Sequence, residues 1–281
     1  MDRPKNLKEA LREDLTEEEL EELGTSFDIV GDIAILKLSE KLLDKKKRIG
    51  KALMEVHGNL STVLRQTSPV SGEFRTRDLE VIAGEHKTVT EHKEHGCVFR
   101  VDLAKVYFSP RLAHERFIIA QKVNPGEVVT NMFAGVGCYS IVIGRHAEPE
   151  KVYSIDKNSD AVSYMRHNIR VNKLGDVVIP IEGDAREAID EYIGGKSDRV
   201  LMPLPEFGRE FFDSALEALK PEGGIIHFYD YGEEPDLFKP SFDFIKSASR
   251  GRSVKLKDKR VVRSYAPNLY HVVLDLEVGA K

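Results

Sequence analysis

Between residues 111 and 249 the chain alternates short apolar runs with segments of helical periodicity. Such alternation predicts βα units and a mainly parallel sheet that is covered by helices on both faces. Two further strand-like segments, near 253–263 and 270–278, follow without a helix of length between them and predict an antiparallel addition at the sheet edge. The remaining predicted strands are 127–133, 151–155, 177–182, 198–204 and 223–231, and the predicted helices are 111–122, 138–146, 160–173, 186–193, 208–219 and 236–249.

The pattern before residue 106 is different. An acidic segment with helical periodicity, 7–23, ends at Gly24, and a second predicted helix covers 39–57. Two short strands surround Gly31, and further strands are predicted at 61–65, 78–83, 87–91 and 97–103. These elements predict three parts, which are an acidic N-terminal helix (1–24), a small α+β module (25–105) and a third domain (106–281).

The segment Asn131–Gly137 carries the clearest chemical signal. It ends an apolar strand with Phe133, Gly135 and Gly137, and the next predicted strand ends at Asp156. A strand, a glycine turn, a helix and a second strand with a carboxylate at its end are typical of a nucleotide-type cofactor site. The third glycine of a dinucleotide motif is absent. This absence favours S-adenosyl-L-methionine over NAD, because S-adenosyl-L-methionine has no pyrophosphate that the turn would have to bind.

Two further strand ends follow in the same order along the chain. Asp184 and Ala185 follow the third strand, where a carboxylate can accept the adenine amino group. The segment Pro203-Leu204-Pro205 follows the fourth strand. Each of these alone also fits a turn or a helix cap. Because ligands of parallel sheets lie beyond the carboxyl ends of the strands, their ordered recurrence predicts one cofactor site.

The segment from Phe108 to Arg116 precedes the first of these strands. If 111–122 is helical, Arg111 and Glu115 lie one turn apart, as in an ordinary surface ion pair. Beside a cofactor pocket the same carboxylate could instead take a proton from a ring nitrogen, with the arginine orienting it.

Charge and cysteine content limit the kinds of partner, metal site and cellular location that we expect. The net charge is −5, and residues 1–24 carry all of it with nine acids and four bases, so the remainder is formally neutral. Bases cluster at 45–48, at Arg75 with Arg77 and at 250–260, where phosphates could bind. The two cysteines lack a metal-type spacing, so we expect no metal and a cytoplasmic location. No apolar run is long enough to indicate a membrane partner.

These motifs together resemble a known family. The chain is similar to the archaeal and eukaryotic tRNA (guanine-N1)-methyltransferases, which modify the purine 3′ of the anticodon. It also resembles their sister group, the wybutosine-synthesis enzymes that transfer the aminocarboxypropyl group of the same cofactor. The matching segments are Ser26–Asp32, Phe108–Leu112 with Glu115 and Arg116, Met132–Gly137, Asp198–Met202, Ile226–Tyr229 and Ser264–Pro267.

The resemblance implies a class I (Rossmann-like) methyltransferase fold with a seven-stranded, mainly parallel sheet, preceded by a small α+β module. By this resemblance the chain would methylate guanine N1 at position 37 of tRNA and would bind the anticodon arm. We also expect it to be monomeric. Glu115 would be the general base, Arg111 would support it and Arg75 would hydrogen-bond the guanine. By the resemblance, the residues that would contact the cofactor are Ser109, Arg116, Asp156, Asp184 and Ala185. Tyr139 and Phe207 are candidates to line the target-base pocket together with residues 203–205.

One departure keeps alternatives open. The methyltransferases usually have Asn-Leu-Pro where this chain has Pro203-Leu204-Pro205, so an amide near the target base is missing. Leu204-Pro205 and Arg111 favour methyl transfer over aminocarboxypropyl transfer, because the sister enzymes usually have Gly-Tyr after the fourth strand and lack this arginine. A third alternative is a catalytically inactive RNA-binding homologue.

Overall fold

The computed structural model describes residues 4–281, so the first three residues of the predicted segment 1–24 lie outside the described residues. The chain divides into two compact units, one up to Arg111 and the other from Leu112 to Lys281. Within the described part, no helix is both long and apolar enough to cross a membrane.

The first unit contains a four-stranded sheet in the order β1-β2-β3-β4 and a separate hairpin of β5 and β6. Strands β2 and β3 are parallel, whereas the other pairs are antiparallel. Helix α3 packs on β3 and β4 through buried Ile49 and Leu53. The elements are α1 Leu7–Ala10, α2 Glu17–Glu22, β1 Phe27–Val30, β2 Ile33–Leu36, α3 Lys46–Val56, β3 Thr62–Gln66, β4 Leu79–Gly84, β5 Val89–Glu94 and β6 Cys97–Asp102.

The prediction of one helix over 7–23 is wrong, because α1 and α2 are separate. Thr16 caps α2: its side chain accepts from the backbone of Glu19, and the Glu19 side chain accepts from the backbone of Thr16. This reciprocal capping box starts a new helix. Leu11 and Leu15, in the intervening segment, are buried in the core of the first unit.

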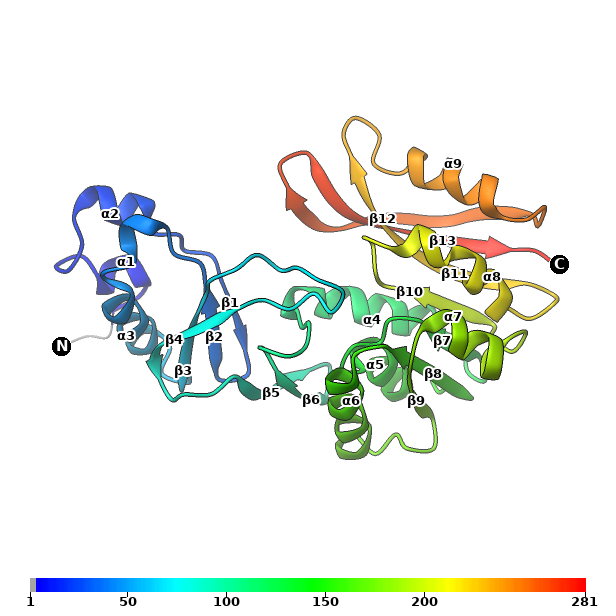
Figure 1. The fold of residues 1–281 in the computed structure, drawn as a ribbon, viewed down its shortest axis with the longest axis horizontal. Helices are drawn as coiled ribbons and strands as arrows, with labels where there is room; N and C mark the ends of the chain where they lie inside the picture. Colours follow the sequence, from blue (N-terminus) through cyan, green and yellow to red (C-terminus); the bar gives the residue numbers. More distant parts are fainter. Residues whose placement is uncertain (1–3) are drawn as a thin grey trace. The chain divides into compact units, whose positions relative to one another are not determined.

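The second unit is built on a seven-stranded sheet in the order β12-β13-β11-β10-β7-β8-β9 (Figure 1). The five strands from β11 to β9 run parallel, whereas β13 pairs antiparallel with both β11 and β12. This arrangement confirms the predicted mainly parallel sheet with a late antiparallel strand. The strands are β7 Val128–Asn131, β8 Lys151–Asp156, β9 Val178–Glu182, β10 Arg199–Met202, β11 Gly224–Glu233, β12 Val254–Ala266 and β13 Leu269–Val278.

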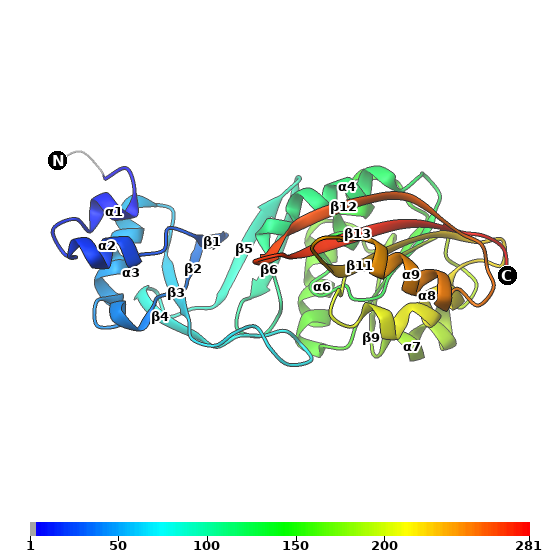
Figure 2. The same ribbon diagram turned by 90° about the horizontal axis from the view of Figure 1, so that it is seen from above.

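Helices cover both faces of this sheet. Helices α7, α8 and α9 share one apolar core with β10, β11 and β13, and Figure 2 shows α4 on the face opposite α8 and α9. Helix α4 packs against α5, while α5 and α6 pack against β8 and β9. The helices are α4 Ala113–Lys122, α5 Cys138–His146, α6 Ser159–Val171, α7 Ala185–Ala188, α8 Phe212–Ala218 and α9 Lys239–Ala248. Three predicted helices are shorter than expected because 3₁₀ segments precede α4 (Pro110–Leu112) and α8 (Gly208–Phe211), and a π-helical turn (Ile189–Ile193) follows α7.

Strand β12 forms one edge of the sheet and contains most of the basic cluster 250–260. Lys255, Lys257 and Lys259 are exposed, whereas Arg252 and Arg260 are largely buried. The Arg252 guanidinium donates to the carbonyl oxygens of Leu216 at 3.0 Å and Gly279 at 2.8 Å. This cluster is therefore not one solvated charge surface.

Candidate active site

The glycine turn between β7 and α5 is fixed by backbone hydrogen bonds. Ala134 donates to the carbonyl of Ile155 on β8 at 2.8 Å, and Gly137 donates to the carbonyl of Ala134 at 2.9 Å. Gly135 and Gly137 have φ values of +55° and +91°, which favour glycine. A Cβ atom on Gly137 would lie 3.0 Å from Met165 Cγ, so the turn needs glycine there for space as well.

The Asp156 carboxylate lies at the carboxyl end of β8 and is oriented by this turn. Its Oδ2 accepts the Gly135 N–H at 2.6 Å, and its Oδ1 accepts the Asn158 N–H at 2.9 Å. Burial raises the Asp156 pKa, and the hydrogen bonds from Asn158 and Gly135 oppose that rise. The structure thus places a preoriented carboxylate directly beside the glycine turn.

The third strand end lies close to the second. Gly183 donates to the Asp156 carbonyl at 3.0 Å, and the next residue, Asp184, caps α7 by accepting from Arg186 N at 2.9 Å. Ala185 is buried in the first turn of α7. Phe133, in the turn after β7, meets the edge of Phe211 with ring centroids 5.0 Å apart. Two aromatic rings therefore contact each other beyond the end of β7.

The segment 203–205 follows β10, as expected. Leu204 N donates to the Met202 carbonyl at 2.8 Å, Pro205 is buried, and Pro203 and Leu204 are partly exposed. As a proline, residue 203 has no backbone N–H to donate.

Glu115 is buried on the first turn of α4, where both carboxylate oxygens are hydrogen-bonded. Oε1 accepts the Tyr229 hydroxyl at 2.6 Å and the Arg260 Nη2 at 2.5 Å, and Oε2 accepts the Arg260 Nε at 2.9 Å. The Tyr229 ring lies 6.1 Å from that of Tyr139, on the first turn of α5. Burial raises the Tyr139 pKa, and the negative charge of Glu115 adds to that rise. The positive charge of Arg116 on α4 opposes it. Glu115 is thus linked to the helix that follows the glycine turn.

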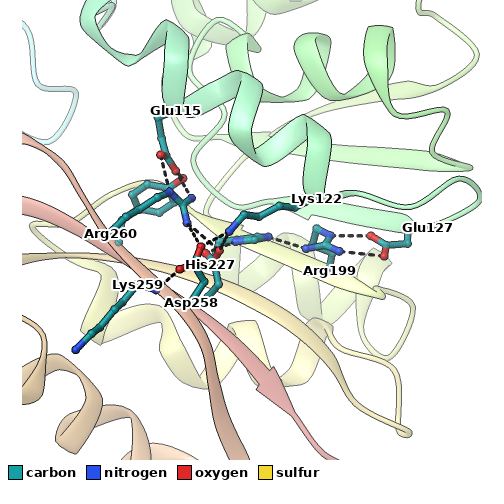
Figure 3. Close-up of polar contacts among 10 residues, drawn as sticks. Glu115, Lys122, Glu127, Arg199, His227, Asp258, Lys259 and Arg260 are labelled. Carbon is teal, nitrogen blue, oxygen red and sulfur yellow. Dashed lines mark hydrogen bonds and ion pairs between the residues drawn. The ribbon is translucent and has the colours of Figure 1, made fainter.

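Arg260 connects Glu115 to a larger buried network (Figure 3). Its Nη1 donates to Asp275 Oδ2 at 2.8 Å, and Asp275 Oδ1 lies 2.6 Å from His227 Nδ1. Arg199 donates to His227 Nε2 at 2.8 Å, and its Nε donates to Glu127 at 2.6 Å. Because arginine only donates, Nε2 is the acceptor and the proton of a neutral His227 is on Nδ1.

The pKa values in this network follow the same contacts. Burial lowers the His227 pKa, although Asp275 raises it. Burial would raise the Asp275 pKa, but the hydrogen bond with His227 and the positive charge of Arg260 hold it well below the usual range. Asp275 is therefore an ionised carboxylate at the centre of the network.

Three predicted residues belong to the first unit. Arg111 lies in the 3₁₀ turn before α4, and its Nε donates to Asp28 at 2.6 Å. Arg75, with φ of +53°, lies between β3 and β4 with its guanidinium 5.2 Å from the Tyr107 ring centroid. Ser109 is buried.

Sequence reasoning did not identify Arg260, Tyr229 or Asp275 as site residues. Arg260 belongs to the basic cluster 250–260, and Tyr229 belongs to the matching segment Ile226–Tyr229. The Glu115–Arg260 pair joins residues 145 positions apart, so no local spacing could indicate it. Among residues 4–281, no group of three metal-ligating side chains occurs.

The model of the TRM5/TYW2 methyltransferase domain matches residues 90–257, and that of the TYW2 N-terminal domain matches residues 7–88. The chain belongs to the TRM5/TYW2 methyltransferase family. The resemblance stated from the sequence is therefore confirmed.

Individual relatives lie on both branches of the TRM5/TYW2 family. A Pyrococcus abyssi protein named tRNA (guanine(37)-N(1))-methyltransferase Trm5b is 43% identical over 259 residues, which cover 92% of this chain and 76% of the relative. The structure of a complex of aTrm5 and tRNALeu has a TM-score of 0.88 at 38% identity, covering 99% of this chain and 79% of that chain. A structure of P. horikoshii TYW2 in complex with MeSAdo has a TM-score of 0.81 at 31% identity, with 98% of each chain covered.

Proposed function

We propose that this protein is a tRNA methyltransferase that transfers a methyl group from S-adenosyl-L-methionine to N1 of guanine 37. The observation that carries the proposal is the buried Glu115 carboxylate, which is linked through Tyr229 and Tyr139 to the helix that follows the glycine turn. The proposed base and the glycine turn of the proposed cofactor site thus lie in the same compact unit, Leu112–Lys281. The 43% identity to the P. abyssi protein named Trm5b supports the same reaction.

The residues around the glycine turn fit the cofactor. The turn holds no side chain at Gly135 or Gly137, and Asp156 offers an oriented carboxylate for the two ribose hydroxyls. Asp184 and Ala185 would adjoin the adenine, with Phe133 as apolar wall, and Ser109 and Arg116 are further proposed contacts. The bound cofactor supplies an electrophilic methyl group.

Glu115 is the proposed general base. Guanine N1 carries a proton at neutral pH, so its electron pair is not available until a base takes that proton. A carboxylate at this position removes the proton as the nitrogen attacks. Arg111 and Arg75 are proposed to support the base and to hydrogen-bond the guanine, while Tyr139 and residues 203–205 would line the target-base pocket.

The proposed RNA partner is the anticodon arm of tRNA. The target base must leave its stack, at a cost of a few kcal/mol that is smaller in a loop than in a duplex. We assign catalysis to residues 106–281, RNA binding or linking to 25–105, and no catalytic role to the acidic segment 1–24. The structure of aTrm5 with tRNALeu supports an RNA substrate.

A second candidate is aminocarboxypropyl transfer, which the match of residues 7–88 to the TYW2 N-terminal domain favours. The two reactions leave different byproducts. Methyl transfer releases S-adenosylhomocysteine, and aminocarboxypropyl transfer releases methylthioadenosine.

The test is incubation of the protein with cofactor and anticodon-arm transcripts that carry G or A at position 37. The expected results are a mass gain of one methyl group on the G transcript alone and release of S-adenosylhomocysteine. Equal modification of both transcripts overturns the proposal, and methylthioadenosine establishes the second candidate. If neither transcript reacts, a Pro203→Asn variant that gains turnover would support the inactive RNA-binding homologue.

We further propose that the protein acts as a monomer in the cytoplasm. Size-exclusion chromatography with light scattering tests the monomer, and a mass of two chains at working concentration contradicts it. Fractionation of cells of the source organism tests the location.

A further inference from the structure

We infer that Arg260 is a positioning residue that holds Glu115 and leaves Oε2 as the atom that receives the proton of guanine N1. This inference rests on the proposed function. The Arg260 guanidinium binds Glu115 through two nitrogens, with Nε on Oε2 and Nη2 on Oε1. Two parallel N–H···O bonds fix the plane of a carboxylate as well as its position.

The two oxygens of Glu115 are not equivalent. Oε1 accepts from both Arg260 Nη2 and Tyr229, whereas Oε2 accepts from Arg260 Nε alone among the described residues. A carboxylate oxygen has two lone-pair positions, so Oε2 keeps one for the substrate. In the proposed step the N1–H bond breaks and an Oε2–H bond forms, while the N1 electron pair forms a bond to the methyl group. The bond from that methyl group to the sulfonium sulfur breaks, its electron pair stays on sulfur, and S-adenosylhomocysteine leaves.

Arg260 is itself held from its other side. Its Nη1 donates to Asp275, and Lys122 Nζ donates to the same Asp275 oxygen. Lys122 lies seven residues after Glu115 on α4, which is two turns, so both side chains leave the same face of that helix. The helix is therefore tied to β12 and β13 at two points, and Glu115 can neither slide nor rotate without breaking buried ion pairs.

The charges around Glu115 exclude proton transfer by Arg260. The hydrogen bond and the charge of Glu115 raise the pKa of Arg260 further above its usual value despite burial, so it stays protonated. Burial raises the pKa of Tyr229, on β11, and that of Tyr139, on α5, so both are neutral phenols near pH 7. Arg116, on α4, adds a second positive charge near Tyr139. Arg260 thus acts by geometry and fixed charge.

The test compares single-turnover methylation by Arg260→Met, Arg260→Lys, Glu115→Gln and the double variant Glu115→Gln/Arg260→Met. Loss of the guanidinium is expected to slow the chemical step by about 10²-fold, as misplacement of a reacting group does, with cofactor affinity within about threefold of wild type. Arg260→Lys is expected to recover only part of the rate, because an ammonium keeps the charge but lacks the bidentate fork. The double variant is expected to be no slower than Glu115→Gln.

Arg250→Met is the matched control, since Arg250 also binds two carboxylates, Asp213 and Glu217, but at the surface. It is expected to react like wild type. A rate for Arg260→Met within about threefold of wild type overturns the inference, as does a double variant that is slower than Glu115→Gln by the full Arg260→Met factor. If Arg260→Met does not fold, full activity of Arg260→Lys overturns it equally. The wild-type product decides the proposed function separately.

Discussion

Gly135 and Asp156 are joined by a hydrogen bond of 2.6 Å from the Gly135 backbone N–H to Asp156 Oδ2. The bond connects the turn after β7 to the end of β8, so the two parts of the proposed cofactor site are held in one geometry before any ligand binds. Preorganisation of this kind reduces the entropy that binding would otherwise lose.

Asp156→Asn is expected to weaken cofactor binding by about 10- to 100-fold, because it removes the charge from bonds that contribute about 1.5–3 kcal/mol. Isothermal titration with S-adenosylhomocysteine measures this. Burial raises the pKa of Asp156 above the ordinary 3.8, so wild-type affinity should fall as the pH is lowered through that raised value. Asp243→Asn, which changes an exposed ion pair with Lys239, is the control. Equal decreases in cofactor affinity for the two variants would contradict the assignment of Asp156 to the cofactor site.

Gly137→Ala is expected to destabilise the protein more than Gly126→Ala does. Both residues have positive φ, +91° and +79°, but a Cβ on Gly137 would lie 3.0 Å from Met165 whereas nothing lies within 4 Å at Gly126. The left-handed backbone alone costs about 1–2 kcal/mol for alanine. Urea unfolding of both variants separates this shared backbone cost from the steric cost of the contact with Met165. Equal decreases in the free energy of unfolding would show that Met165 moves away freely.

Asp275→Asn is expected to lower the free energy of unfolding by about 3–5 kcal/mol at pH 7, because removal of one partner leaves buried charges uncompensated. The pKa of Asp275 is held below the ordinary 3.8. Its contribution is therefore present above the ordinary pKa and is lost as the pH falls towards the lowered value. Urea unfolding should show that the difference in free energy of unfolding between wild type and Asp275→Asn becomes smaller below pH 3.8. A difference that does not change with pH would contradict the proposed ion-pair network.

Glu115→Gln is expected to slow the chemical step by about 10²–10⁴-fold, as loss of a general base does, without weakening the cofactor. Rapid-quench single turnover and equilibrium titration measure the two quantities. Glu277→Gln, which breaks an exposed pair with Lys257, serves as the control. A Glu115→Gln rate within about threefold of wild type would leave Glu115 as a structural partner of Arg260.

Much of the second unit follows from local pattern. Cys138–His146 is a helix with the predicted bounds, and the order of strands and helices is as predicted, because periodicity and glycine turns are local signals. The break between α1 and α2 also had a local signal, since Thr16 and Glu19 have capping-box spacing.

The arginine partners were not predictable in the same way. Strand alternation would separate inward from outward side chains along β12, but register shifts at Leu256/Asp258 and at Val261/Arg263 interrupt it. A run of bases therefore did not reveal that Arg260 turns inward to Glu115. Only the paired strands and the packed helix specify that contact.

The exposed lysines of β12 have a consequence for colloidal behaviour. An edge strand presents unpaired backbone groups that a second chain can join, and such joining can continue into aggregates. Lys255, Lys257 and Lys259 would have to give up hydration and approach like charges if two such edges met. The same strand that directs Arg260 inward thus protects the open side of the sheet from self-association during synthesis and at high concentration.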